Sequence, residues 1–154
     1  MANINVSSPS NFATLMISTA TSFSTATALT VPALQDITVS NNNGQFRWKQ
    51  LDSTAQRVVA TPSTNSVAFN IVLDPDSFYG TTGASAAGQG LFALSNNKTQ
   101  LSFRMYWSGT ATGSHYVEGT GFIVGLAPKV NPDQPVWITP LTIEVDGNFT
   151  AGTV

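Results

Sequence analysis

The residues best suited to chemistry are a single histidine and the serines near it. His115 is the only histidine among the 154 residues, and Ser108 and Ser114 lie close to it in the chain. A serine hydrolase needs a nucleophile, a base and an orienting carboxylate in a recognisable arrangement, commonly on a strand–turn–helix elbow. Neither serine has such a surrounding or a matching partner spacing. We therefore interpret His115 as a turn residue beside Gly113.

Two acidic pairs could hold a metal or perform acid–base work. Asp74-Pro75-Asp76 resembles the start of a calcium loop, but it lacks the EF-hand spacing and the bidentate glutamate at the twelfth position. A turn explains it better. Glu144 and Asp146 are two residues apart on an expected strand, so both point to one face. Nothing places them in a pocket, which favours a solvated or channel-lining face over paired-carboxylate catalysis. We expect no metal and no cofactor.

Aromatic and cationic residues alternate in one segment, Phe46-Arg47-Trp48-Lys49. Some single-strand nucleic-acid binders show this pattern. An amphipathic strand shows it too, with Phe46 and Trp48 directed inward and the two cations outward. A basic face is usual in nucleic-acid binders, whereas the isoelectric point of this chain is about 5.0. The pattern therefore indicates a strand.

The composition favours a protein that packs against other copies or partners. Charged residues make up 9% of the chain, against about 25% in ordinary soluble domains. With a formal net charge of −2, little repulsion keeps copies apart. The absence of cysteine excludes disulfides and thiolate chemistry. The N-terminus has no signal-peptide pattern and no apolar run approaches the roughly 20 residues of a membrane span, so we expect synthesis in the cytosol.

The elements that must position these residues are mostly strands of one domain, residues 1–154. We expect a flexible arm at 1–10 and long assembly loops within 20–65. Asn41-Asn-Asn-Gly44 predicts a hairpin turn that joins 36–40 to 45–51, and 61–65 predicts a further loop. Period-2 alternation and β-rich composition predict strands at 11–19, 67–73, 99–107, 116–126 and 136–145. The alternation also predicts that Trp107 and Trp137 are buried.

One short helix is expected at Ala84–Leu94. Ala84, Ala87, Leu91 and Leu94 share one helical face. Glycines 83, 88 and 90 weaken the helix by about 1 kcal/mol each relative to alanine in a helix interior. Such a helix is marginal alone, so we expect it to dock on a sheet.

The order of these elements resembles the tail tube proteins of long-tailed bacteriophages, of the lambda-like type. The resemblance extends from Val67 to the C-terminus. It is carried by the segments Ser66–Leu73, Gly88–Leu94, Lys98–Trp107, Gly121–Leu126 and Pro135–Gly147.

The resemblance implies a mainly β fold, a β-sandwich or partial barrel with one short flanking helix, whose sheet joins a ring-shaped barrel on oligomerisation. It implies a structural virion protein, without enzymatic activity, that forms stacked hexameric rings of a tail tube conducting DNA into the host. Its partners would be copies of itself and the tail-tip, terminator and tape-measure proteins, with DNA passing without specific binding and no membrane contact. Its location would be the virion tail, assembled in the host bacterial cytoplasm.

The resemblance also implies two sets of site residues. Glu118, Glu144 and Asp146 would face the lumen, where a mildly acidic wall lets DNA slide without sticking. Ile4, Val6 and Phe12 would form a ring-stacking arm that orders on assembly. Two other classes remain open. One is a different virion protein, a capsid decoration or head–tail connector subunit. The other is a carbohydrate-binding β-sandwich that exposes Trp48, Trp107 or Trp137 in one groove.

Overall fold

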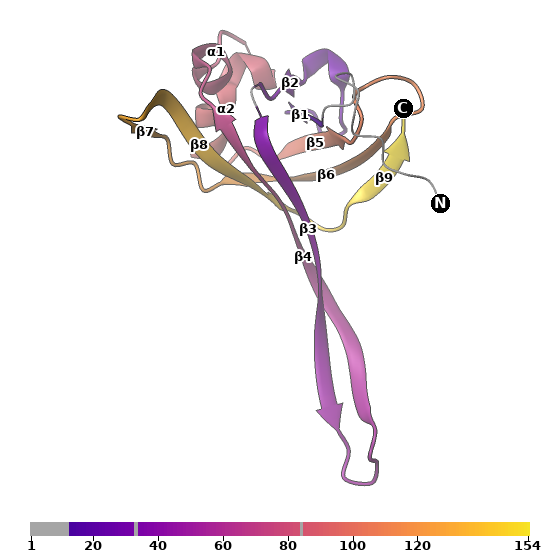
Figure 1. Ribbon diagram of the computed structural model, residues 1–154. Helices are drawn as coiled ribbons and strands as arrows, with labels where there is room; N and C mark the ends of the chain where they lie inside the picture. Colours follow the sequence, from indigo (N-terminus) through magenta and orange to yellow (C-terminus); the bar gives the residue numbers. More distant parts are fainter. Residues whose placement is uncertain (1–12, 33, 84) are drawn as a thin grey trace.

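The computed structural model describes residues 13–32, 34–83 and 85–154. The predicted arm residues Ile4, Val6 and Phe12, and Ala84 of the expected helix, lie outside the described residues. Within the described part, the elements are β1 (Thr14–Ser18), η1 (Thr25–Thr27), β2 (Leu29–Thr30), β3 (Leu34–Lys49), β4 (Gln56–Val72), α1 (Pro75–Tyr79), α2 (Ala86–Asn96), β5 (Leu101–Tyr106), β6 (His115–Val124), β7 (Lys129–Asn131), β8 (Gln134–Val145) and β9 (Thr150–Thr153) (Figure 1).

The strands of the described residues form one antiparallel nine-stranded sheet, which confirms the mainly β prediction. The strand order is β2-β1-β5-β6-β8-β4-β3, with β7 on β8 and β9 on β6. Although β2 and β3 are consecutive in the chain, they are edge strands at the two ends of this strand order. A groove lined by residues of β1, β2 and β3, among them Thr14, Thr30 and Ile37, separates these edges. The sheet is therefore curled but open.

The antiparallel register places inward-facing side chains opposite one another. Phe69 of β4 lies opposite Leu141 of β8, and Leu15 of β1 lies opposite Met105 of β5. Each of these four side chains is at most 2% exposed. The predicted inward positions of the strands at 67–73 and 99–107 are thus confirmed, apart from Trp107. Because alternate residues of a strand face opposite sides, the same register defines a second face that the core does not cover.

Two short helices cover the core face, where one was expected. The predicted turn at Asp74-Pro75-Asp76 is instead the start of α1: the Asp74 carboxylate accepts hydrogen bonds from the Ser77 N–H (3.1 Å) and hydroxyl (2.9 Å). Aspartate at the N-cap followed by proline is a favourable helix start. α2 buries Leu91 and Leu94 in the core, as the periodicity predicts. No helix of the described residues is long and apolar enough to cross a membrane.

The region 20–65, for which we predicted long loops, is largely a long β-hairpin. The predictions of a turn at Asn41–Gly44 and of a loop at 61–65 are therefore both wrong. The two segments pair with each other across β3 and β4, with Asn42 opposite Thr64 and Gly44 opposite Thr61. The register shifts between these pairs, a β-bulge that accommodates Pro62, which cannot donate to the ladder. The chain reverses only between Lys49 and Gln56.

The hairpin projects from the sheet because its neighbour ends early. β8 pairs with β4 only over residues 65–72, so residues 56–64 pair with β3 alone. At the usual rise of a strand, this part is about 30 Å long. It points away from the end of the molecule that carries α1, α2 and β7 (Figure 1).

The predicted burial of Trp107 and Trp137 is also wrong. Their exposed fractions are 50% and 54%. β5 ends at Tyr106, so Trp107 falls in the following bend, where strand alternation no longer applies. Trp137 lies on β8 beyond the last fully buried position, Thr139, and its carbonyl accepts a hydrogen bond from the Leu73 N–H (2.8 Å).

Candidate assembly surfaces

The three carboxylates predicted to line a lumen lie on the face of the sheet opposite the core, which we call the outer face. Gly121 and Ile123 of β6 pair with core-facing residues of β8, so Glu118 and Phe122 point outward, and Phe122 pairs with Glu144. Asp146 follows β8 directly, is exposed, and accepts a hydrogen bond from Gln100 Nε2 (3.3 Å). The register therefore brings the predicted set to one side of the sheet.

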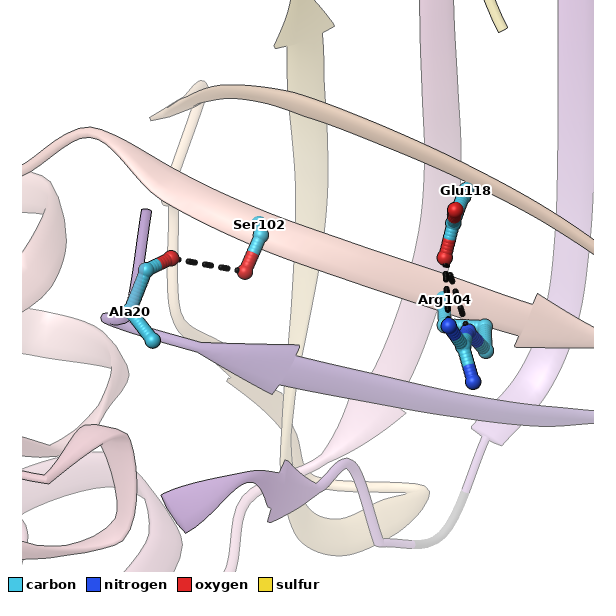
Figure 2. A network of polar contacts seen from close by, with 4 residues as sticks. All are labelled: Ala20, Ser102, Arg104 and Glu118. Carbon is cyan, nitrogen blue, oxygen red and sulfur yellow. Dashed lines mark hydrogen bonds and ion pairs between the residues drawn. The ribbon is translucent and has the colours of Figure 1, made fainter. Parts of the chain in front are cut away.

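Glu118 differs from the other two because Arg104 of the same chain neutralises it. Arg104 Nη2 lies 2.6 Å and Nε 2.9 Å from Glu118 Oε2 (Figure 2). The guanidinium is also 4.5 Å from the Phe23 ring centre and 4.0 Å from that of Tyr116. Cations are attracted to aromatic faces at such distances. Glu144 and Asp146 thus supply the free negative charge of the predicted set.

The segment before η1 covers this part of the outer face. The Ser102 hydroxyl of β5 donates a hydrogen bond to the Ala20 carbonyl (2.9 Å) (Figure 2). The ring of Phe23 packs on the Arg104 guanidinium. Arg104, Phe23, Tyr116 and Glu118 together form what we call the arginine clasp. It fastens the segment to β5 and β6.

Arg104 keeps its positive charge at every physiological pH. Burial lowers the pKa of Arg104, but hydrogen bonds to Tyr106 and Glu118 and the negative charge of Glu118 raise it above its ordinary value overall. A raised pKa in the folded state means that the stabilisation by Arg104 is complete at every pH below the pKa of arginine in the unfolded chain. It is lost only at more alkaline pH.

Replacing Arg104 by methionine is expected to lower the free energy of unfolding by about 2 kcal/mol, since it leaves Glu118 partly buried without a partner and removes both ring contacts. Arg104→Lys keeps the charge but not the planar fork, and should cost about 1 kcal/mol. Urea unfolding measures both. The matched control is Arg47→Met, because Arg47 is exposed and bonds to Gln45 on its own strand. Equal effects at the two arginines would contradict the clasp.

The far part of the hairpin, residues Phe46–Val59, is an exposed apolar and cationic surface that we call the distal hairpin. The exposed fractions are 61% for Phe46 and 36% for Trp48, and their rings stack with centres 5.9 Å apart. The side chains predicted to point inward therefore have no core beneath them. Val58 and Val59 on the facing strand are about half exposed. Large apolar surfaces of this kind mark interaction sites.

Charge is distributed unevenly between the distal hairpin and the remainder of the chain. Arg47, Lys49 and Arg57 are three of the six cations, and Asp52 is the one acidic residue in the same stretch. The distal hairpin thus carries a formal charge of +2. The remainder of the chain carries −4, which together gives the net charge of −2.

A second apolar surface lies at the opposite end of the molecule, and we call it the end groove. It has a volume of about 270 Å³ and is lined by Leu73, Pro75, Phe78, Tyr79, Pro128 and Trp137. Tyr79 is 69% exposed. Its ring lies 6.4 Å from that of Phe92, which also packs on Phe78. Asp74 and Asp76, both exposed, flank the lining residue Pro75 in the sequence.

The residues first considered for catalysis do not form a reactive site. His115 is the first residue of β6 rather than part of the turn, and its Nδ1 lies 3.2 Å from Thr153 Oγ1 of β9. The Asp74 carboxylate caps α1. Among the residues that the structure describes, no cluster of three or more acidic or histidine side chains could hold a metal ion.

Comparison with known proteins gives matches in structure only. No protein-family model matches the chain, and no curated protein sequence does so. The tail of an empty gene transfer agent particle refined with C6 symmetry is similar, with a TM-score of 0.64 and 11% identity over 90% of this chain and 96% of that chain. The virion of a native gene transfer agent particle is similar with a TM-score of 0.61 and 12% identity, over 90% of this chain and 95% of that chain. The SPP1 tail tube is similar with a TM-score of 0.69 and 10% identity, over 96% of this chain and 79% of that chain. The chain therefore has a fold found in these three structures.

Proposed function

We propose that the protein is a structural virion protein that assembles into stacked hexameric rings, forming a tail tube that conducts DNA into the host. The observation that carries this proposal is the likeness of fold to tail structures over at least nine-tenths of the chain. The proposal includes the long-tailed, lambda-like type that the sequence resembles. The protein acts through its shape and assembly, without catalysis.

The open sheet supports the proposal that neighbouring subunits complete the sheet of each copy. β2 and β3 are edges, and exposed sheet edges invite pairing with other chains. Closure of a ring removes such edges, and a rotationally symmetric ring does so for every copy at once. The low charge of the chain leaves little repulsion to oppose this packing.

The charges on the outer face support the proposal that this face forms the wall of a channel. Glu144 and Asp146 are exposed on it, while Arg104 is held by Glu118. Phosphate-binding surfaces instead present free lysine and arginine side chains. A wall with free carboxylates lets DNA pass without specific binding. Glu118 contributes to this wall as half of a neutral pair. The remaining partners in the proposal are the tail-tip, terminator and tape-measure proteins, with assembly in the host bacterial cytoplasm.

Concentration-dependent assembly tests the proposal. We expect purified protein to change from monomers to tubes as its concentration rises, seen by sedimentation velocity and by negative-stain microscopy with and without the tail-tip partner. Monomers at all concentrations, even with that partner, would contradict the proposal. Trimers, or isolated rings that never stack, would instead favour a capsid decoration or head–tail connector subunit.

A further inference from the structure

We propose that the turn at Asp146-Gly147 is a site of spontaneous covalent modification in the folded protein, at which aspartate isomerises to isoaspartate. Asparagine or aspartate precedes glycine at two places in the chain, Asn43-Gly44 and Asp146-Gly147. Both pairs can react, because glycine has no side chain to obstruct its own main-chain nitrogen. The reaction belongs to the single chain, so it does not depend on the proposed function.

The reaction moves the main chain from one carboxyl group of the aspartate to the other. The Gly147 nitrogen attacks Cγ of Asp146 in its carboxylic acid form, a C–N bond forms, and water leaves, which closes a five-membered imide ring. Water then adds to the former main-chain carbonyl of Asp146 and breaks the bond from that carbon to the nitrogen. The chain now continues through Cβ and Cγ, and the former main-chain carbonyl has become a carboxylate. Addition of water to the other carbonyl restores aspartate, and neither route consumes an oxidant or a reductant.

The structure leaves this turn open to ring closure. β8 ends at Val145, and Asp146 and Gly147 are both exposed in the bend that follows. Gly147 has φ +94°, and a Cβ there would meet no atom within 4 Å. The space around the attacking nitrogen is therefore free.

The other pair is held by the β-ladder. Asn43 and Gly44 lie within β3, and Gly44 pairs with Thr61 of β4. Ring closure requires the glycine nitrogen to lie on the same side as Cβ of the preceding residue, whereas extended backbone turns the two apart. A Cβ at Gly44 would also overlap the Thr61 side chain, so the two strands are closely packed at this point. Asn43 is thus expected to react only when the hairpin opens locally.

Isomerisation should loosen the turn because it lengthens the main chain between two anchors. The Asp146 N–H donates a hydrogen bond to the Thr120 carbonyl (2.7 Å), and the Gly147 carbonyl accepts one from Asn65 Nδ2 (2.8 Å). Isoaspartate inserts an additional main-chain carbon between these two points, so at least one of the bonds must break or shift. Asn65 is 2% exposed, and its Oδ1 has no hydrogen-bond partner among the described residues. Loss of the bond to Gly147 would leave this buried carboxamide with only its longer bond to Ser63 Oγ (3.4 Å), which is unfavourable.

Ageing of the folded and the unfolded protein tests the site. Trypsin separates the two pairs, because Asn43 lies in the fragment 1–47 and Asp146 in the fragment 130–154. After incubation at neutral pH in buffer or in urea, isoaspartate in each fragment is measured by labelling with isoaspartyl methyltransferase and located by mass spectrometry. Folding should slow the reaction at Asn43 at least about tenfold and leave the rate at Asp146 within about threefold of its value in urea. Equal protection of the two pairs, or no isoaspartate at Asp146 in the folded protein, would overturn the proposal.

Two substitutions at the same position separate the chemistry from the geometry. Asp146→Glu keeps the charge but cannot close a five-membered ring, so it should remove isoaspartate from the fragment 130–154. Asp146→Asn replaces a carboxylate by a better electrophile, and in the folded protein it should react several-fold faster than wild type, with release of ammonia. An asparagine there that is stable in the folded protein but reacts in urea would show that the turn blocks ring closure, and would refute the site.

Thermal unfolding of the aged proteins tests the two anchors. Aged wild-type protein should contain a population that melts below the fresh protein, in proportion to its isoaspartate content. Aged Asp146→Glu is the matched control and should melt as it does when fresh. Isoaspartate at Asp146 without a change in melting, or an equal loss in the control, would contradict the loosening of the turn.

Discussion

A chain whose hairpin is shortened is expected to fold normally and to lose assembly. Replacing residues 45–60 with Asn-Gly joins the paired residues Gly44 and Thr61 by a type I′ turn, which suits a two-residue hairpin. The fold should survive because β4 keeps its pairing with β8 over residues 65–72, and Val67, Phe69 and Ile71 keep their places in the core.

Assembly should fail because the deletion removes Phe46, Trp48 and half of the chain's cations. Aromatic anchors are often worth 2 kcal/mol or more each at an interface, so the concentration required for assembly should rise by at least about a hundredfold. Sedimentation velocity measures it, and circular dichroism verifies the fold. The matched control is Leu51→Ser at the tip, which keeps the stacked rings. Unchanged assembly of the shortened chain would show that the hairpin has no part in it.

The second large effect is expected at Gly90, where α2 is kinked against α1. Gly90 has φ +76° and Gly80, at the end of α1, has φ +79°. A Cβ at Gly90 would lie 2.3 Å from the Gly80 backbone nitrogen. Gly90→Ala therefore combines left-handed strain with a backbone clash, and should lower the free energy of unfolding by about 3–5 kcal/mol. Because total stability is typically 5–15 kcal/mol, the variant is expected to be largely insoluble or to melt well below wild type.

Gly113 provides the control for this substitution. It has φ +90°, and a Cβ there would meet no atom within 4 Å. Gly113→Ala should therefore carry the strain alone, about 1–2 kcal/mol. Thermal and urea unfolding of the two variants separate strain from clash. If both glycines gave the same loss, the close approach of α1 and α2 would be unimportant for stability.

The strands of the core were predictable because alternation and burial coincide there. The segment at 67–73 alternates in sequence, and its inward residues are buried against β8 and β3. Leu91 and Leu94 of α2 were predictable for a similar reason, since a helical stripe of apolar residues requires a surface to cover. The role of Gly90 was not predictable, because its close contact is with α1. The sequence analysis had predicted a turn in place of the start of that helix.

The hairpin was mispredicted because its local signals conflict with its pairing. Asn41–Gly44 and 61–65 each favour a turn, but they face each other and share one bulge. The actual reversal between Lys49 and Gln56 contains neither glycine nor proline. Phe46 and Trp48 alternate as core residues do, although no sheet neighbour covers them. Single-chain alternation cannot distinguish a core from an interface that another copy completes.

The outer face was predictable in part. The spacing of Glu144 and Asp146 places both on one side of a strand, and the register adds Glu118 to that side. The pairing of Glu118 with Arg104 depends on the register of β5 and β6, in which the two residues lie directly opposite. The sequence contains no signal for that register, because the two residues are 14 positions apart.

Electron cryomicroscopy of the assembled protein distinguishes a tube from any other assembly. We expect stacked rings of six subunits around an open channel, with the outer face of β4, β6 and β8 toward the channel and each distal hairpin in contact with another copy. Glu144 and Asp146 would then line the wall. Particles without a channel, or rings whose wall is formed by the helices, would contradict it.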